Sequence, residues 1–333
     1  MKAKKMLAAL LAASLGLLPA CSSPSSTADA GTPPAASTMD EAGDVVDLGG
    51  LLDEGVPLAG SPALSTVLMP VAAATDVKSN ASACIDMSNK ADGYVMIKYT
   101  GGSDAQLKAR VTGPSGTVYT YNLRADGQYD TFPLSDGNGS YTATVYKNIS
   151  GTSYSTVLSA KFSVSLIDEF APFLRPNQYV NFSTSSKAVS RAQQLTAGMT
   201  DNLEKVQIVY NFVISNITYD RVLAANVQSG YLPDVDAVLE KGKGICFDYA
   251  AVMAAMLRSQ GVPTKLVVGY TGKVYHAWLN VYSEETGWVD GIIYFDGSTW
   301  KLMDPTFASS NKSSDSIMKY IGNGANYQAK YLY

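Results

Sequence analysis

The chain has 333 residues, of which 46% are hydrophobic and 16% are charged, a composition typical of globular rather than disordered proteins. Its formal net charge is −4, and lysine and arginine are scattered apart from Lys2, Lys4 and Lys5. Because the sequence has no basic stripe, nucleic acid is not an expected partner. The length suits about two domains of ~150 residues each.

The N-terminus has the pattern of an export signal. Three lysines precede an apolar stretch, Met6 to Leu18, which is short for a membrane span. The stretch ends in "LPAC" at residues 18–21, which resembles the lipobox of bacterial lipoproteins. The resemblance implies that residues 1–20 are a signal peptide and that Cys21 is diacylated. The protein is then exported and lipid-anchored to the bacterial cell membrane, facing outward. An ordinary signal peptide cut after Ala20 is the alternative.

Residues 21–75 are predicted to be a flexible linker. The segment "SSPSSTADAGTPPAASTMDEAGD" at 22–44 is rich in Ser, Ala, Pro and Thr, and it has too few bulky apolar residues to order itself. Such a spacer would hold a domain away from the membrane. Residues 51–75 are more apolar, and they fit either a linker or a segment that docks on a domain.

Residues 76–166 are predicted to form a β domain. Short alternating runs occur at 94–99, 106–111, 117–123, 140–146 and 160–166. Turn signals lie between them, at 113–116 ("GPSG") and 136–139 ("DGNG"). This spacing favours a small all-β immunoglobulin-like sandwich. Its Tyr and Thr content could indicate a binding face, but the exposed positions of any exported β domain look the same, which favours an ordinary exposed sheet.

From about residue 186 the apolar period becomes helical. One face of a helix over 201–217 carries Leu203, Val206, Tyr210 and Val213. Asp201 and Glu204 have the spacing of a capping box. A second short helix fits 234–242. A third begins near Cys246 and stops at Gly261 and Pro263.

Cys246 is predicted to lie in the first turn of that third helix. The partial positive charge at a helix N-terminus favours a thiolate, and the free N–H groups there can hold an oxyanion. Gly242 and Gly244 allow a sharp turn before the cysteine. The stretch fits a nucleophile and a small buried hydrophobic residue equally well.

His276, the single histidine of the chain, lies 276 − 246 = 30 residues after the cysteine. It falls in "VYHAWLNVYS" (274–283), which alternates as a strand. His276, Trp278, Asn280 and Tyr282 share one face of this strand, which we expect to be a cleft wall. Histidine is the usual general base of a thiol enzyme, which favours a catalytic role over that of a structural histidine.

The stretch "GSTWKLMDPTF" (297–307) supplies a third candidate. Asp296 and Gly297 signal a hairpin turn. Asp304 shares a strand face with Trp300 and Leu302 and ends the strand. An aspartate there can accept the second N–H of the histidine and fix its tautomer. The motif means little alone, but it completes the order Cys, His, Asp.

Residues 200–308 resemble the transglutaminase-like superfamily. The resemblance rests on "GKGICFDYAAVMAAMLRSQGVPTKLVVGY", "HAW" and "MDPTF" in order, with "NITYD" (216–220) upstream. It implies a papain-like α+β core over residues 186–333, with the cysteine helix packed on an antiparallel sheet. It also implies that Cys246 is the nucleophile, His276 the base and Asp304 the orienting residue. Tyr219 is the candidate side-chain donor to an oxyanion.

Two departures from the family pattern concern the cleft rather than the triad. Leu279 and Asn280 follow "HAW" where relatives often have Asn-Glu, and the stretch 289–299 is long. The family chemistry passes through an acyl-enzyme, which water or an amine resolves. We therefore expect hydrolysis or transamidation of amide bonds in peptide or protein substrates, cell-wall and surface proteins included.

No cofactor or metal is expected, because the carboxylates form no EF-hand-type calcium loop. Two alternatives stay open. The first is a non-catalytic surface lipoprotein that binds ligands with the same fold. The second is a disulfide between Cys84 and Cys246, since an exported protein can meet an oxidising compartment. Such a bond would remove the nucleophile.

Overall fold

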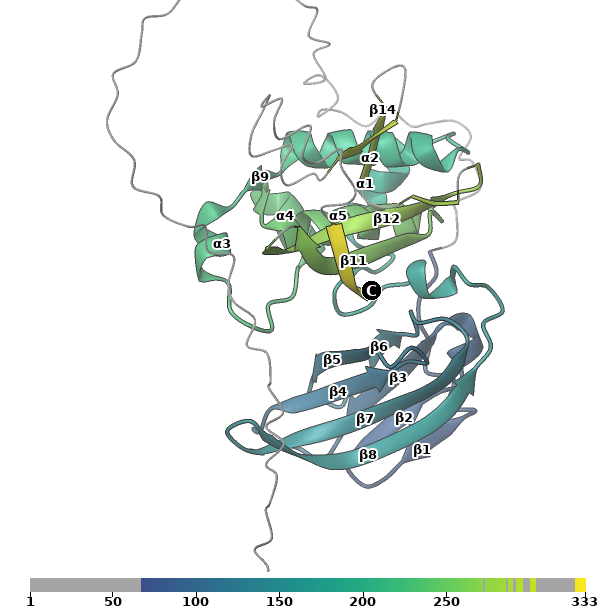
Figure 1. Cartoon of the computed structure of the whole chain (residues 1–333), viewed down its shortest axis with the longest axis vertical. Helices are drawn as coiled ribbons and strands as arrows, with labels where there is room; N and C mark the ends of the chain where they lie inside the picture. The colour runs from purple at the N-terminus through teal and green to yellow at the C-terminus, as the bar shows by residue number, and fades with distance from the viewer. Residues whose placement is uncertain (1–66, 272, 286, 290–291, 296–299, 304–326) are drawn as a thin grey trace, which may run out of the picture.

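A computed structural model describes residues 67–271, 273–285, 287–289, 292–295, 300–303 and 327–333 of the chain. Figure 1 shows a β-rich part built from the earlier residues below a mixed part in which helices pack against a sheet. The mixed α and β architecture with antiparallel sheets confirms the predicted fold class.

The β-rich part has two four-stranded antiparallel sheets, with strand orders β1-β2-β3-β6 and β5-β4-β7-β8. The strands are β1 (Val77–Ser79), β2 (Ala83–Asp86), β3 (Tyr94–Tyr99), β4 (Leu107–Thr112), β5 (Val118–Leu123), β6 (Asp130–Pro133), β7 (Gly139–Ser150) and β8 (Ser153–Val164). Short 3₁₀ turns lie at Lys90–Asp92 and Ala171–Phe173.

Alternation of apolar and polar side chains creates the core of this β domain. In β4, Leu107, Ala109 and Val111 are buried, whereas Arg110 between them is exposed. Successive side chains of a strand point to opposite faces, so one face of each sheet is apolar and packs inward. The β domain itself is confirmed, and its immunoglobulin-like character stays a prediction.

Residues 67–75 dock on the β domain, which is the second of the two alternatives left open for residues 51–75. The backbone N–H of Val71 donates to the hydroxyl of Tyr94 over 3.0 Å, and the N–H of Ala74 donates to the carboxylate of Asp86 over 2.9 Å. Buried side chains therefore satisfy the backbone of this segment. Residues 21–66 lie outside the described part.

The second part contains five helices within the described residues. They are α1 (Lys187–Leu195), α2 (Asn202–Asn216), α3 (Arg221–Asn226), α4 (Val235–Lys241) and α5 (Cys246–Ser259). The strands are β9 (Thr218–Tyr219), β10 (Lys243–Gly244), β11 (Thr264–Thr271), β12 (Val274–Ser283), β13 (Gly287–Val289), β14 (Ile292–Phe295), β15 (Trp300–Met303) and β16 (Tyr327–Leu332).

Aspartate caps begin three of these helices. Asp201 accepts a hydrogen bond from the N–H of Glu204, as its spacing predicts, and Asp220 and Asp234 cap α3 and α4 in the same way. Each carboxylate satisfies an N–H that has no partner within the helix.

Helix α5 is the centre of the second part. It packs against β11 and β12 on one side and against α1, α2 and α4 on the others. Every side chain of α5 except that of Phe247 is buried. The sheet beneath it has the antiparallel order β13-β12-β11-β16. A buried helix on this sheet fixes the position of Cys246 at the helix start.

Tyrosine rings join the two parts. Tyr333, which follows β16, contacts Tyr119 and Tyr121 of the β domain at centroid distances of 5.6 and 5.8 Å. It also contacts Tyr179 of the connecting segment at 4.2 Å. Arg258 of α5 donates to the backbone carbonyl of the same Tyr333. The apolar core therefore runs without a break from the sandwich into the second part.

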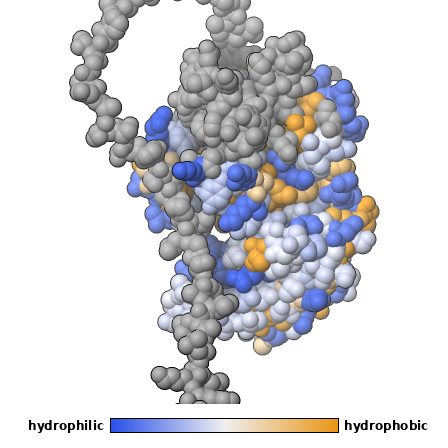
Figure 2. Space-filling view, viewed as in Figure 1, coloured by the Kyte–Doolittle hydropathy of each residue, from blue (hydrophilic) through white to orange (hydrophobic). Residues whose placement is uncertain are grey.

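The face seen in Figure 2 carries hydrophobic residues as small separate patches among hydrophilic ones, outside its grey regions. Scattered patches of this kind are ordinary on a protein surface. Among the helices that the structure describes, none is both long and apolar enough to cross a membrane.

Candidate active site

Cys246 is the first residue of α5, as predicted, and it is 7% exposed. Gly242 ends α4 in the left-handed region with a φ of 59°, and the two-residue strand β10 then leads into α5. At Gly244 any Cβ would lie 2.6 Å from the Cβ of Asp248. Glycine is therefore required at both positions for the chain to reach Cys246 along this path.

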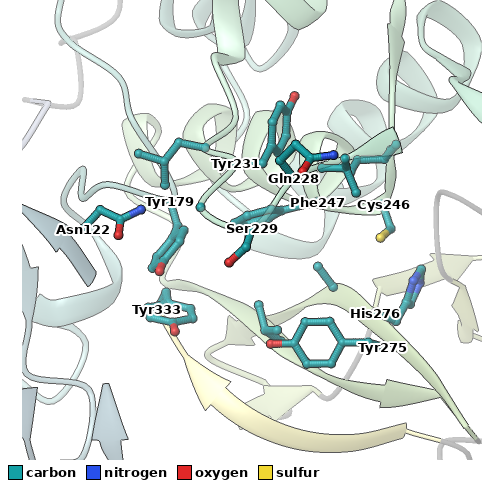
Figure 3. Close-up of a pocket in the computed structure, with 16 residues that line it drawn as sticks. Asn122, Tyr179, Gln228, Ser229, Tyr231, Cys246, Phe247, Tyr275, His276 and Tyr333 are labelled. Atoms are coloured by element: carbon teal, nitrogen blue, oxygen red, sulfur yellow. The ribbon is translucent and has the colours of Figure 1, made fainter. Parts of the chain in front are cut away.

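His276 lies on β12, opposite Gly269 of β11, and is 5% exposed. It lines the same pocket as Cys246. Figure 3 shows the Cys246 sulfur pointing toward the strand that carries His276, whose ring rises toward it. The tertiary fold thus brings the predicted nucleophile and the predicted base together.

The pocket around them, called here the Cys246 pocket, has a volume of about 200 Å³. Its wall combines the start of α5, strands β11 and β12, the loop 227–232, and residues Asn122, Tyr179 and Tyr333. Asn122 belongs to β5, so the β domain supplies part of the wall. None of the described residues that line the pocket is Lys, Arg, Asp or Glu. The pocket therefore suits an uncharged group such as an amide.

Tyrosines are frequent among the residues that line this pocket, which include Tyr179, Tyr231, Tyr275 and Tyr333. Burial raises the pKa of Tyr179 to about 12 and raises the pKa of Tyr275 and of Tyr333 above the ordinary value. These phenols stay protonated at neutral pH and can donate hydrogen bonds to a substrate.

Asp248 is a site residue that the sequence analysis missed. Its carboxylate is 0% exposed and accepts hydrogen bonds from the N–H of Ile245 over 2.8 Å and from the hydroxyl of Tyr231 over 2.7 Å. Burial raises the pKa of Asp248. An acidic residue at the third position of a helix is a capping signal. This signal could have identified Asp248 from the sequence.

The predicted cleft wall on β12 is wrong apart from His276. Trp278 and Asn280 are buried and do not line the pocket, and the Tyr282 ring packs on Phe170 at 4.2 Å. Neighbouring elements cover these side chains, so within the described part of the chain β12 reaches the pocket only around His276.

Tyr219 and Asp304 stay predictions. Tyr219 pairs with Gly244 through the parallel strands β9 and β10, which places its backbone near Cys246, but it is not among the residues that line the pocket. Its role as an oxyanion donor is untested. Asp304 lies outside the described residues.

The alternative of a Cys84–Cys246 disulfide is wrong, because both cysteines are free thiols. The Cys84 sulfur lies 3.2 Å from the hydroxyl of Tyr129 inside the β domain. Cys246 is thus available for chemistry. No group of three or more His, Cys, Asp or Glu side chains with the geometry of a metal site occurs among the described residues.

Residues 189–290 match the sequence model of the transglutaminase-like superfamily. This segment contains α5 and β12, with Cys246 and His276, and it is a transglutaminase-like domain.

Three individual proteins are similar to this chain at low sequence identity. Uncharacterized protein YebA of Bacillus subtilis (strain 168) is 29% identical over 119 aligned residues, and the match covers 29% of this chain and 16% of that protein. A structure from Cytophaga hutchinsonii, provisionally described as a cysteine protease, is 18% identical with a TM-score of 0.33, covering 62% of this chain and 68% of that one. Red sea bream transglutaminase is 11% identical with a TM-score of 0.30, covering 69% and 53%. Likenesses this distant say nothing about activity.

The segment is a transglutaminase-like domain, and the one cysteine and one histidine among the described pocket-lining residues face each other. Together these findings support a thiol-based enzyme in general terms.

Proposed function

We propose that this chain is a thiol acyl-transfer enzyme that acts on amide bonds of peptides or proteins. The observation that carries the proposal is the shared pocket of Cys246 and His276, at the start of α5 and on β12. A nucleophile within reach of a general base is the arrangement that covalent catalysis needs. The uncharged wall of the pocket suits a neutral amide substrate.

The first half-reaction forms a thioester. His276 takes the proton of the Cys246 thiol, and the thiolate adds to the amide carbonyl, whose oxygen becomes negative. The N–H groups of the first turn of α5, which have no partner within the helix, are proposed to stabilise this oxyanion. The C–N bond then breaks as the imidazolium returns the proton to the leaving amine. Asp304 is proposed to orient the imidazole, on the basis of sequence resemblance alone.

The second half-reaction resolves the thioester. His276 removes a proton from water or from a substrate amine, which attacks the acyl carbon and releases Cys246. Water gives hydrolysis, and a lysine amine gives a cross-link. The export signal and the "LPAC" motif support a lipid-anchored protein at the outer side of the bacterial cell membrane, with Cys21 as the anchor.

The test is to trap the acyl-enzyme. Purified protein would be incubated with dimethylated casein, with and without a fluorescent primary amine, then quenched in acid and analysed by mass spectrometry. An acyl adduct on Cys246 that is absent from Cys246→Ala and retained in Cys84→Ala would support the proposal. New casein N-termini would indicate hydrolysis, and incorporated amine would indicate transamidation. Casein that binds equally to the protein and to Cys246→Ala, with no adduct or product, would favour the binding-lipoprotein alternative.

A further inference from the structure

The Cys246 pocket has two chemically different ends. Figure 3 shows Cys246 and His276 at one end and Tyr179 and Tyr333 at the other. The ring of Phe247 lies 5.5 Å from that of Tyr179, and Tyr179 packs on Tyr333 at 4.2 Å, both distances between ring centroids. We call Tyr179, Phe247 and Tyr333 the aromatic end. All three line the pocket, so the reactive groups and the aromatic end belong to one cavity.

Phe247 differs from the rest of helix α5 in its exposure. It is the only residue of the helix that is not buried, although its side chain is large and apolar. It also follows the nucleophile directly in the chain. Removing apolar surface from water is favourable, so a substrate side chain that covers Phe247 would stabilise the complex.

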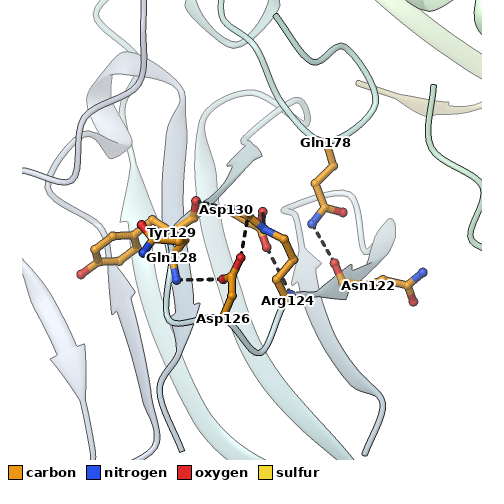
Figure 4. A network of polar contacts seen from close by, with 7 residues as sticks. All are labelled: Asn122, Arg124, Asp126, Gln128, Tyr129, Asp130 and Gln178. Carbon is orange, nitrogen blue, oxygen red and sulfur yellow. Dashed lines mark hydrogen bonds and ion pairs between the residues drawn. The ribbon is translucent and has the colours of Figure 1, made fainter. Parts of the chain in front are cut away.

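Tyr179 is held in place by the hydrogen bonds of its neighbours. The side chain of Asn177 accepts from the N–H groups of Tyr179 and Val180 over 2.9 and 3.0 Å. Figure 4 shows the side chain of Gln178 donating to the backbone carbonyl of Asn122 in β5, over 2.7 Å. These bonds fix the segment that carries the Tyr179 ring against the β domain. A ring that is already ordered costs little further conformational entropy when a ligand packs on it.

Tyr333 is fixed from the opposite side. Its ring contacts that of Tyr121 at 5.8 Å, and Arg258 donates to its backbone carbonyl. The hydroxyls of Tyr333 and Tyr179 share a hydrogen bond with each other. Because these two hydroxyls partly satisfy one another, the aromatic end presents mainly ring surface to the pocket.

The size and charge of the pocket limit what can occupy the aromatic end. Its volume is about 200 Å³. A cavity of ~150 Å³ holds a benzene ring, so the pocket has room for little more than one ring beside an amide. A charged side chain would lose its water here and find no opposite charge among the described Lys, Arg, Asp and Glu side chains, since none of them lines the pocket. An aromatic ring gains apolar burial and favourable ring contacts together.

We propose that the aromatic end binds an aromatic side chain of the substrate, next to the amide that lies between Cys246 and His276. The enzyme then selects peptides or proteins by an aromatic residue beside the scissile bond. The β domain takes part in this selection, because it supports both Tyr179 and Tyr333. This inference rests on the proposed function and names its substrate class more narrowly.

The binding experiment uses the full chain with Cys246→Ala, so that it does not depend on catalysis. Four capped tripeptides, acetyl-Gly-X-Gly-amide with X as Phe, Leu, Ala or Glu, are titrated by saturation-transfer NMR. Each contains at most one ring, so the result does not depend on how the peptide is aligned. We expect the Phe peptide to bind at least about tenfold more tightly than the Ala peptide and about threefold more tightly than the Leu peptide. The Glu peptide should bind no more tightly than the Ala peptide.

Phe247→Ala, added to this protein, removes one ring of the aromatic end. It should reduce the advantage of the Phe peptide over the Ala peptide about three- to tenfold. Phe212→Ala is the matched control: Phe212 is also partly buried, and its ring lies under Arg191, but it does not line the pocket. The control should keep the full advantage. Tyr179→Phe keeps the ring and removes the hydroxyl, so it should also keep the advantage.

A second variant covers the case in which Phe247→Ala fails to fold. Ser229 is exposed on the loop 227–232 and lines the pocket, and Figure 3 shows its hydroxyl pointing into it. Ser229→Trp would fill the space and should remove the advantage of the Phe peptide. Ser190→Trp, at an exposed position of α1 outside the pocket, is its control. Equal affinities for the Phe, Leu and Ala peptides, no binding of any, or equal effects of variants and controls would each overturn the inference.

Failure of the proposed function would give a different result. Wild-type protein would then leave every peptide intact and form no acyl adduct on Cys246, even where the Phe peptide binds best. If instead the Phe and Ala peptides react with equal kcat/KM, the enzyme assignment survives and the aromatic end loses its role in selection.

Discussion

The hydroxyl of Tyr231 donates a 2.7 Å hydrogen bond to the carboxylate of Asp248. This bond joins the loop 227–232, which walls the Cys246 pocket, to the helix that begins with Cys246. Asp248 also accepts from the N–H of Ile245, so a single buried carboxylate holds both the helix start and the loop. The position of the pocket wall is thereby coupled to the position of the nucleophile.

Tyr231→Phe should loosen that wall. Losing a hydrogen bond to a buried charged group costs about 1.5–3 kcal/mol, and the loop would then sample positions away from the pocket. We expect kcat/KM to fall about tenfold or more while circular dichroism stays unchanged. Tyr154→Phe removes a hydroxyl that bonds Gln106 at an exposed site and should leave kcat/KM unchanged. Equal effects of the two variants would contradict this role.

Because of Asp248, the protein should become less stable as the pH rises in the acidic range, the opposite of what an ordinary salt-bridged aspartate causes. Burial raises its folded pKa above the ~3.9 of an unfolded aspartate, so between these two values the folded state binds more protons. The free energy of unfolding should therefore fall as the pH rises through the folded pKa. Urea denaturation at several pH values would measure it. Asp248→Asn should lack this component, and the exposed control Asp104→Asn should retain it.

Cys246 should react with iodoacetamide faster than Cys84 at neutral pH. Exposure alone predicts the reverse, because Cys246 is buried and Cys84 is partly exposed. Only activation by the helix start and His276 would invert the order. Peptide mapping after timed alkylation measures both rates. His276→Ala should remove the neutral-range step from the pH profile of Cys246 alkylation, since the chain has no other histidine.

Cys246 and His276 should act as one unit in turnover. We expect Cys246→Ala and His276→Ala each to lower kcat by similar factors, on the order of a thousandfold or more, and the double variant to be little worse. The reason is that loss of either group already disables the other. Asp304→Asn should reduce kcat less severely. Additive losses in the double variant would argue against the pair.

Arg258 should be among the most costly residues to replace. Its buried guanidinium donates to the carbonyls of Thr264, Arg175 and Tyr333, at 2.7–2.9 Å for the first two. Arg258→Met fills similar volume but leaves these carbonyls without donors, at a cost of about 3–5 kcal/mol of unfolding free energy. Denaturant unfolding tests it, with the exposed Arg110→Met as control, which should change stability by less than about 0.5 kcal/mol.

Helices α2, α4 and α5 were predictable because their signals are local, whereas the short helices α1 and α3 were not predicted. Asp201 caps α2 with the bond to Glu204 that its spacing implies, and β12 spans the residues predicted for it. The short strands β2 and β6 were missed. Each contains an aspartate, Asp86 or Asp130, that accepts hydrogen bonds from a neighbouring segment rather than from its own strand. Aspartate is unfavourable in strands, so each stretch reads weakly as a strand. The hydrogen-bonding partner that compensates for the aspartate is visible only in the folded structure.

The residues of the Cys246 pocket divide in the same way into those that could be predicted from the sequence and those that could not. Cys246 and His276 could be paired from residue chemistry and order along the chain. Asn122, Tyr179 and Tyr333 could not, because they reach the pocket only through packing of the β domain and the last described strand against the second part. No local pattern reports such contacts. The predicted cleft wall failed for the same reason, since Phe170 covers Tyr282 from far along the chain.

The order of synthesis gives the last strand a particular importance. β16 pairs with β11, and Tyr333 closes one side of the Cys246 pocket while Arg258 holds its carbonyl. Until these residues leave the ribosome, β11 has an open edge and the pocket lacks a wall. A nascent chain that already contains Cys246 and His276 is therefore incomplete as a binding site. The proposed reactivity toward amides would thus appear only after the final described residues are in place.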